Sequence, residues 1–337
     1  MNSRERVRRA IRFRKPDRIP ISHAVLPAAQ LKYGKSLDAI LTEFREDFGW
    51  DYLPDQPPER FSPQYRPGDN ADDFGTVWRV EWEGVCGIPV RWPIPDLARY
   101  DEFRWPRDFA AGPPPERHYS GHMSGYDERW YARGAWIVFF EQLQQLRGME
   151  NLLCDIAEES PAFLGLMDDL QAFHLRWIDR WLSYEYDGLH FGDDWGTQSG
   201  LLIRPEAWRR LFKPRYAEMF RRVKDAGRDV WFHSDGFIND IAGDLIEIGV
   251  DVLNFQVAVT GHDWAARNIR GKVAVRTDID RQSVLPFGSP AAVREEVFRT
   301  FESCGTPDGG IIACGEVGPD VPLANIRAMY EAFRDRP

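Results

Sequence analysis

The residues best placed to carry chemistry are His233 and Asp235, which follow the apolar run Val230-Trp231-Phe232. On a β-strand, residues i and i+2 point to the same face, so this imidazole and carboxylate can meet in one pocket. Gly236 then lets the chain turn away. Both side chains bind metals and transfer protons, so the strand end predicts a metal or acid–base site. The alternative is a polar turn that only hydrogen-bonds the next loop.

Polar side chains of the same kinds follow most other apolar runs in the second half of the chain. One such residue is ordinary for a loop, but here nearly every run ends in an ionisable or amide group. These are residue types that bind metals or move protons. The residues are Glu141, His190, Asp193, Asp194, Asn254, Gln256, Arg276, Asp278, Asp280, Cys314 and Glu316.

Strand-like and helix-like segments alternate along the chain, as parallel βαβ units do. We expect strands at 19–25, 135–140, 188–191, around Trp231, and at 252–255, 273–276 and 310–314. We expect helices at 3–13, 160–184, 205–226, 238–248, 291–301 and 323–333. No Gly-rich dinucleotide fingerprint follows the first strand. The pattern predicts the α/β class, with one (β/α)8 barrel domain over residues 1–337 and an N-terminal helical extension.

Two segments interrupt the alternation. Residues 75–92 contain β-type residues with Gly84 and Gly87 at turns, which predicts an inserted β-hairpin. Residues 93–125 are rich in proline and predict a loop that could serve as a lid. In a barrel of this type the active site lies at the carboxyl ends of the strands, so the polar residues named above should converge there.

Bulk composition excludes several classes of protein. The 337 residues include 53 acidic and 43 basic ones, and the net charge of −10 argues against a nucleic-acid surface. No run of apolar residues is long enough to span a membrane, and the N-terminus lacks the apolar core of a secretory signal. The four scattered cysteines are typical of a reduced, cytoplasmic protein. The aromatic segment 173–184 would suit a homodimer contact.

Several motifs together resemble the uroporphyrinogen decarboxylase superfamily. The resemblance covers nearly the whole chain and implies a (β/α)8-type barrel. The motifs are Phe-His-Ser-Asp-Gly at 232–236 with 244–254, Gly-Asp-Asp-Trp-Gly-Thr-Gln at 192–198, Phe140-Glu141 with Leu146-Arg147-Gly148, Leu-Pro-Phe-Gly at 285–288, Ser-Arg-Glu-Arg-Val at 3–7 with Pro16-Asp17-Arg18, and Pro-Asp-Val-Pro at 319–322.

The superfamily has a metal-free branch that decarboxylates uroporphyrinogen and a branch of zinc-dependent, corrinoid-linked methyltransferases. The first carries an arginine-rich stretch after the first strand, but residues 22–27 here contain no arginine. A substrate with many carboxylates would therefore lack its cationic clamp. The resemblance thus favours the methyltransferase branch over a true uroporphyrinogen decarboxylase.

In that branch zinc is typically held by a His-x-Cys pair and a later cysteine. Here His233 is kept, Asp235 replaces the first cysteine, and the third ligand is either Cys314 or Glu316. Replacing a thiolate by a carboxylate makes a harder site. Such a site suits Zn²⁺ that holds a water or a substrate oxygen in an open position.

The resemblance implies a metal-dependent methyltransferase-like enzyme, of the demethylase type, that acts on a small O-methyl or similar substrate. Glu141 or Asp193 would act as the acid, and a corrinoid protein partner would carry cobalamin, since the chain has no Asp-x-His-x-x-Gly motif. The substrate pocket would be lined by His190, Asp194, Gln198, Asn254, Gln256, Arg276 and Asp278. The alternatives are a metal-free decarboxylase or lyase, with Arg276 or Arg281 holding a carboxylate, and a ligand-binding barrel without catalysis.

Overall fold

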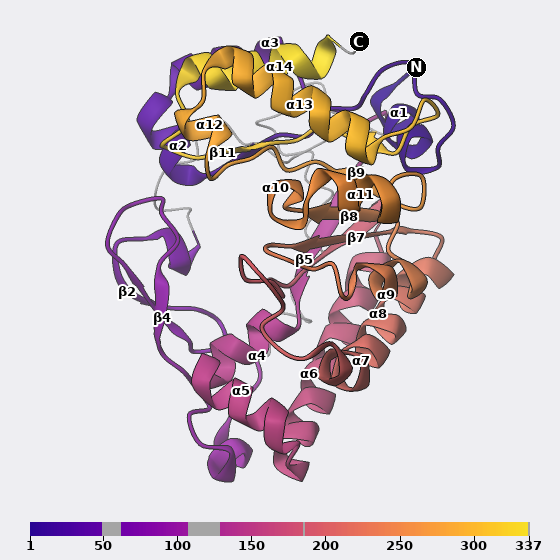
Figure 1. The fold of residues 1–337 in the computed structure, drawn as a ribbon. Coiled ribbons are helices and arrows are strands. Elements are labelled where there is room, and N and C mark those ends of the chain that lie inside the picture. Colours follow the sequence, from indigo (N-terminus) through magenta and orange to yellow (C-terminus); the bar gives the residue numbers. More distant parts are fainter. Residues whose placement is uncertain (49–61, 107–128, 185, 336–337) are drawn as a thin grey trace.

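The computed structural model describes residues 1–48, 62–106, 129–184 and 186–335. Its centre is a six-stranded parallel sheet in the order β10-β9-β8-β7-β6-β5 (Figure 1). The strands are β5 (Arg133–Val138), β6 (Gly188–Gly192), β7 (Asp229–Ser234), β8 (Val252–Phe255), β9 (Ala274–Arg276) and β10 (Ile311–Ile312). A short parallel pair, β1 (Ala24–Val25) with β11 (Glu316–Val317), extends this arrangement at the carboxyl ends.

Backbone hydrogen bonds complete the ring between the two edges of the six-stranded sheet. Ser22 N donates to Ala313 O at 2.9 Å, Asp47 N to Ile21 O at 2.8 Å, and Tyr131 N to Asp47 O at 3.4 Å. These bonds lead from the segment after β10 through residues 21–22 and 47 to Tyr131, two residues before β5. Within the described residues, the parallel segments therefore close into the barrel that the alternation predicts.

Helices connect and cover the strands. Those before β5 and between β5 and β7 are α1 (Ser3–Ile11), α2 (Pro27–Tyr33), α3 (Lys35–Glu43), α4 (Phe140–Arg147), α5 (Met149–Glu158), α6 (Pro161–Leu182), α7 (Pro205–Leu211) and α8 (Lys213–Asp225). Those after β7 are α9 (Ala242–Glu247), α10 (Val257–Thr260), α11 (His262–Asn268), α12 (Val284–Phe287), α13 (Pro290–Cys304) and α14 (Leu323–Arg334). No helix in the described ranges combines the length and the apolar character needed to cross a membrane.

Local sequence explains several helix boundaries. Asn2 caps α1 by accepting a hydrogen bond from Glu5 N at 2.8 Å, and Ser160 caps α6 in the same way. The single helix predicted over 205–226 is wrong, because the chain divides at Phe212, two residues before Pro214. A proline lacks the N–H that an uninterrupted helix needs, so Pro214 lies instead in the first turn of the new helix α8. The helix expected at 238–248 is shorter, covering only α9.

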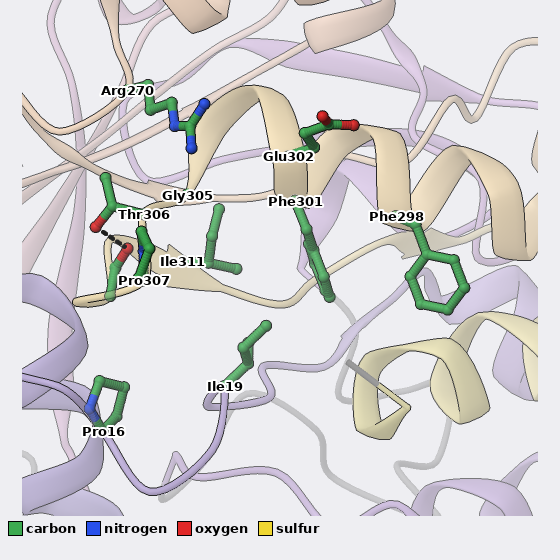
Figure 2. Close-up of a pocket in the computed structure, with 11 residues that line it drawn as sticks. Pro16, Ile19, Arg270, Phe298, Phe301, Glu302, Gly305, Thr306, Pro307 and Ile311 are labelled. Atoms are coloured by element: carbon green, nitrogen blue, oxygen red, sulfur yellow. Dashed lines mark hydrogen bonds between the residues drawn. The ribbon is translucent and has the colours of Figure 1, made fainter. Parts of the chain in front are cut away.

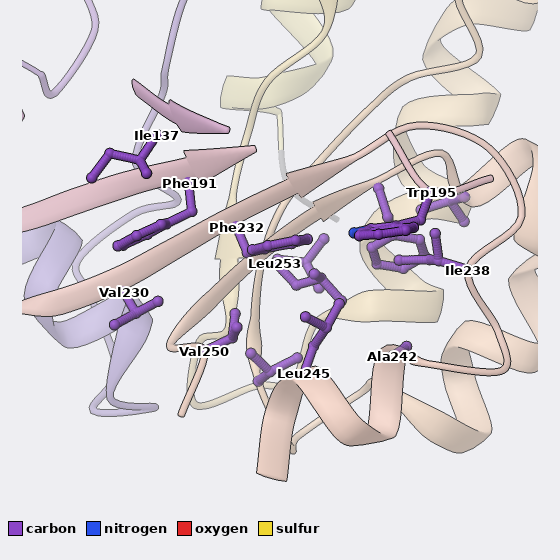
Figure 3. Packing of buried hydrophobic residues seen from close by; sticks show 14 of the residues in the cluster. Ile137, Phe191, Trp195, Val230, Phe232, Ile238, Ala242, Leu245, Val250 and Leu253 are labelled. Atoms are coloured by element: carbon purple, nitrogen blue, oxygen red, sulfur yellow. The ribbon is translucent and has the colours of Figure 1, made fainter. Parts of the chain in front are cut away.

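The residues of each strand alternate between the helix-facing side and the barrel interior. Figure 3 shows Phe191, Phe232 and Leu253 on neighbouring strands, with Leu245 of α9 beside them. The alternate residues of β7 point inward, where Trp231 packs in a separate cluster. That inner cluster also contains Val7, Ile11, Phe48, Tyr131, Val252, Ala274 and Ile312, so α1 closes the amino-terminal end of the barrel. The opposite, carboxyl end stays available for a site.

The inserted element is larger than the predicted hairpin. It is a three-stranded antiparallel sheet of β2 (Gly68–Ala71), β3 (Val77–Val80) and β4 (Ile88–Arg91), flanked by the short helices η2 (Pro63–Tyr65) and η3 (Leu97–Glu102). Strands β3 and β4 form the expected hairpin, and β2 adds to it. Of the predicted loop at 93–125, the part at 107–125 lies outside the described residues, so its role as a lid stays a prediction.

Candidate functional site

Side chains from the carboxyl ends of β5 to β11 surround a cavity of about 210 Å³. Strand register explains this convergence, because His233 is paired with Asn254 and Asn254 with Arg276 on successive strands. Paired residues of parallel neighbours project from the same face. The lining residues are Ala24, Trp136, His190, His233, Asn254, Arg276, Thr277, Asp278, Arg281, Cys314 and Glu316.

Beside this cavity, Asp194, His233 and Asp235 form a group that could hold a metal ion. One potential ligand atom from each lies within 4.8 Å of the others. His233 Nε2 is 3.4 Å from Asp194 Oδ1 and 3.4 Å from Asp235 Oδ1. The site thus offers one imidazole nitrogen and two carboxylate oxygens, a donor set that suits a borderline or hard divalent ion.

Asn254 fixes the orientation of the His233 ring. Its Nδ1 lies 2.7 Å from Asn254 Oδ1, and Asn254 Nδ2 donates to Arg276 O at 2.8 Å. With its nitrogen engaged as a donor, the Asn254 side chain presents its oxygen to the imidazole, so Nδ1 carries the hydrogen and Nε2 faces the carboxylates. A partner of this kind orients metal-binding histidines. Burial opposes a charge on His233, but its contacts with Asp194 and Asp235 raise its pKa to about 9.

The third ligand expected from the sequence differs from the one in this group. Asp194, placed with the substrate residues in the sequence prediction, joins His233 and Asp235, while Cys314 and Glu316 line the cavity outside the group. Glu316 accepts from Arg281 at 2.7 Å. Asp194 joins the group because the turns after β6 and β7 are hydrogen-bonded. The N–H of Asp235 donates to Asp194 Oδ1 at 2.9 Å and thereby holds the two carboxylates together.

Arg281 is a cation that sequence reasoning assigned only to the alternative reaction. Its guanidinium donates to one oxygen of Asp235 and to Glu316, and it lies 3.6 Å from Asp278. The other oxygen of Asp235 is buried and has no hydrogen-bond partner among the residues that the structure describes. Because Arg281 takes Oδ2 of Asp235, the oxygen that faces His233 is the one left for an ion.

Glu141 lies at the start of α4, and the carboxylate of Asp193, which follows β6, reaches the same place, but the two acids differ in environment. Asp193 is fully buried, and its oxygens accept from the backbone N–H groups of Phe139, Phe140 and Glu141 at 2.8–2.9 Å and from the Tyr216 hydroxyl. Its carboxylate therefore holds the start of α4. This geometry argues against Asp193 as the acid.

Among the described residues, no comparable set of hydrogen-bond donors surrounds the Glu141 carboxylate. Burial and the negative charges of Asp193 and Asp194 raise its pKa to about 8. A carboxyl group in this environment stays protonated at neutral pH and can donate a proton. Of the two predicted acids, Glu141 is the better placed.

Of four other predicted substrate residues, two line the cavity and two do not. His190 lines the cavity, its buried Nε2 has no hydrogen-bond partner within the described ranges, and burial holds its pKa well below the usual range. Asp278 also lines it, and burial raises its pKa to about 7. Gln256 instead accepts from Gly236 N at 2.8 Å and supports the turn, while Gln198 is exposed in the loop after β6.

Sequence reasoning also missed groups from outside the barrel strands. Tyr65 of η2 lies close enough to Cys86, Glu316 and Glu141 for their charges to act on it; together with burial they raise its pKa to about 12. The hydrogen bond from Ala28 N to Gly84 O, at 3.0 Å, attaches the inserted sheet to the start of α2. This tertiary packing brings the insert to the site, and no pattern in the sequence could have indicated it.

A second cavity, of about 270 Å³, lies between α13 and the segment that contains Pro16 and Ile19 (Figure 2). Its walls include Pro16, Ile19, Phe301 and Ile311, with Arg270 and Glu302 among the few charged groups. These residues precede or begin the strands, and the cavity lacks the converging acids and imidazoles of the first. Chemistry is therefore expected at the carboxyl end.

These observations define a parallel α/β barrel with a polar site at the carboxyl ends of its strands. The family model described as uroporphyrinogen decarboxylase (URO-D) matches residues 134–336, more than half of the chain. The chain therefore belongs to the uroporphyrinogen decarboxylase family. No curated protein sequence matches it.

Among solved structures, a methyltransferase from Methanosarcina mazei is similar over 99% of this chain and 98% of its own, with a TM-score of 0.67 and 13% identity. At this identity the likeness shows the fold alone. A dihydropteroate synthase from Anaplasma phagocytophilum is similar over 50% of this chain and 66% of its own, with a TM-score of 0.34 and 18% identity. That likeness is too low to support an argument.

Proposed function

We propose that the protein is a metal-dependent methyltransferase-like enzyme that removes a methyl group from a small O-methyl or similar substrate. The observation that carries this proposal is the Asp194–His233–Asp235 group at the carboxyl end of the barrel. The structural similarity to a methyltransferase over 99% of the chain supports it. The cavity of about 210 Å³ lies below the roughly 300–1,000 Å³ typical of sites for drug-sized ligands, which favours a small substrate over a tetrapyrrole.

The three residues fit a divalent ion such as Zn²⁺. Asp235 Oδ1 is buried and finds no hydrogen-bond partner in the described part of the chain, and His233 is oriented by Asn254 with Nε2 toward both carboxylates. An unpartnered buried carboxylate oxygen is costly, and a cation would satisfy it. When bound, the ion would supply Lewis acidity toward a substrate oxygen.

The chain's own residues would bind and protonate the substrate. Glu141, whose pKa is raised by burial and nearby carboxylates, would donate a proton to the leaving oxygen. Arg276 and Asp278 would orient the substrate from the wall of the cavity. The methyl group would pass to a cobalamin carried on a separate corrinoid protein.

Metal analysis of protein purified without a histidine tag tests the proposal. We expect close to one equivalent of divalent metal per chain in the wild type and a large loss in His233→Ala and Asp194→Asn. The matched control is His262→Gln, because His262 also lies 3.1 Å from a carboxylate, that of Glu296, but outside the site. Wild-type protein without stoichiometric metal, after incubation with Zn²⁺ and desalting, would refute a metal-dependent reaction.

A metal-free decarboxylase or lyase is the second candidate, and the position of Arg281 favours it. A guanidinium already neutralises Asp235 and Glu316, so the carboxylates have a cation without any metal. In that reaction Arg276 or Arg281 would hold a substrate carboxylate. Release of CO₂ by chelator-treated protein, lost in Arg281→Met, would support this candidate over methyl transfer.

A further inference from the structure

Trp136 is a large apolar side chain that the barrel leaves exposed. It belongs to strand β5, yet 52% of it is accessible, and it lines the cavity together with His190 and His233. Most other large side chains on these strands are buried. An exposed indole inside a polar cavity therefore needs an explanation.

The backbone turns Trp136 toward the cavity. Gly134 pairs with Leu189 and Ile137 with Phe191, so β5 has one more residue than β6 between these two pairs. The extra residue is accommodated by Ala135, which has φ of +61°. A non-glycine residue in this region is strained, and β-bulges re-aim side chains beside active sites.

The neighbouring strand makes room for the indole. A β-carbon added to Gly192 would lie 2.7 Å from Trp136 Cζ2, so any larger residue would push the ring away. The ring meets His190 edge-on at 4.6 Å between centroids and lies 5.9 Å from the His233 ring. A bulge, a strained residue and an adjacent glycine thus all serve the placement of this one side chain.

We propose that Trp136 is the specificity-determining residue of the cavity, and that its indole stacks on a neutral aromatic ring of the substrate. This inference rests on the proposed function, because the ring would carry the methylated oxygen beside His233. The lining residues include Arg276 and Arg281 beside Asp278 and Glu316, and burial raises the pKa of Asp278 to about 7, so the cavity has no excess of negative charge to attract an onium ligand. Aromatic pairs prefer stacked or edge-on contacts at short range, which an exposed indole face provides.

Calorimetric titration with three probes tests the inference. The probes are 2-methoxyphenol, its saturated counterpart 2-methoxycyclohexanol and tetramethylammonium chloride. We expect wild-type protein to bind 2-methoxyphenol best. Trp136→Leu should weaken that binding by about threefold to tenfold, the effect of losing one aromatic pair, while Trp136→Phe retains most of it. The control is Trp82→Leu, because Trp82 is 71% exposed on the inserted sheet and should not affect the titration.

Each other outcome would overturn the inference. Three results would refute an aromatic substrate. They are equal binding of the aromatic and saturated probes, unchanged binding by Trp136→Leu, and no binding of 2-methoxyphenol at millimolar concentration. Preferred binding of tetramethylammonium assigns the indole to a cation instead. Metal content, measured on the same samples, separates the two proposals. A metal-loaded protein without aromatic binding refutes only this inference, whereas aromatic binding by a protein that takes up no metal refutes only the metal-dependent reaction.

Discussion

Replacing Gly236 by alanine should disrupt the site more than an ordinary glycine substitution does. Gly236 follows Asp235 and has φ of +77°. A β-carbon there would lie 2.2 Å from the carbonyl oxygen of Gly196 and 2.3 Å from its carbonyl carbon. Both contacts are with backbone, so the loops after β6 and β7 would have to separate.

The magnitude follows from two contributions. An L-residue in the left-handed region costs roughly 1–2 kcal/mol. Separating the loops would also break the bonds from Gly196 N to Asp235 O and from Phe237 N to Thr197 O, at 3.1 and 2.8 Å, each worth about 1 kcal/mol. We expect Gly236→Ala to lower the free energy of unfolding by roughly 3–4 kcal/mol.

Gly227→Ala is the matched control, because Gly227 has φ of +71° and nothing within 4 Å of its added β-carbon. It should cost only the backbone contribution, about 1–2 kcal/mol. Equilibrium urea unfolding compares the two, and titration with Zn²⁺ against a competing chelator follows the site. Gly236→Ala should bind Zn²⁺ at least about tenfold more weakly, since Asp194 and Asp235 lie on the displaced loops. Equal losses of stability in the two variants would refute the reasoning.

Three further results are expected. Asn254→Leu should weaken Zn²⁺ binding by about 10- to 100-fold in the same titration, because the orientation of His233 is lost; unchanged affinity would contradict that role. In metal-free protein, His233 has its pKa raised to about 9 by two carboxylates although burial opposes the charge. The charged His233 therefore contributes fully to the free energy of unfolding below the unfolded pKa of about 6.5, and this contribution disappears as the pH rises through about 9. In urea unfolding, the free energy of unfolding of His233→Gln should fall less over that range than that of the wild type. Asp193→Ala should lose roughly 3–5 kcal/mol by leaving backbone N–H groups unpaired. Glu141→Gln should abolish turnover without that loss, and a stable, inactive Asp193→Ala would reverse the two assignments.

The sequence predicted the fold well where apolar runs and caps are local. The alternation of strands and helices indicated the barrel, and the helices expected from residues 3 and 160 are present, capped by Asn2 and Ser160. Prediction failed at 205–226, because helical periodicity alone does not show that Pro214 lies in the first turn of a new helix. It also missed β2, whose pairing with β3 depends on packing beyond either segment.

For the site, the spacing of His233 and Asp235 was sufficient to predict that their side chains meet, at 3.4 Å, since the period of a strand is fixed by its backbone. The same reasoning placed Asp193 and Gln256 there. The structure shows that their oxygens accept backbone hydrogen bonds instead. A carboxylate or an amide after a strand can serve either purpose, and the sequence does not show which donors surround it.

What the sequence alone determined is the set of polar residues at the ends of parallel strands, because strand periodicity and the rule for barrel sites both act locally. What only the tertiary structure decided is how those residues combine. Asp194 joins His233 and Asp235 because two loops are hydrogen-bonded together, and Arg281 reaches Asp235 from a different loop. Trp136 faces the cavity because of a bulge defined by the register of two strands. Each of these contacts joins residues that are distant in sequence, so no local pattern could encode it.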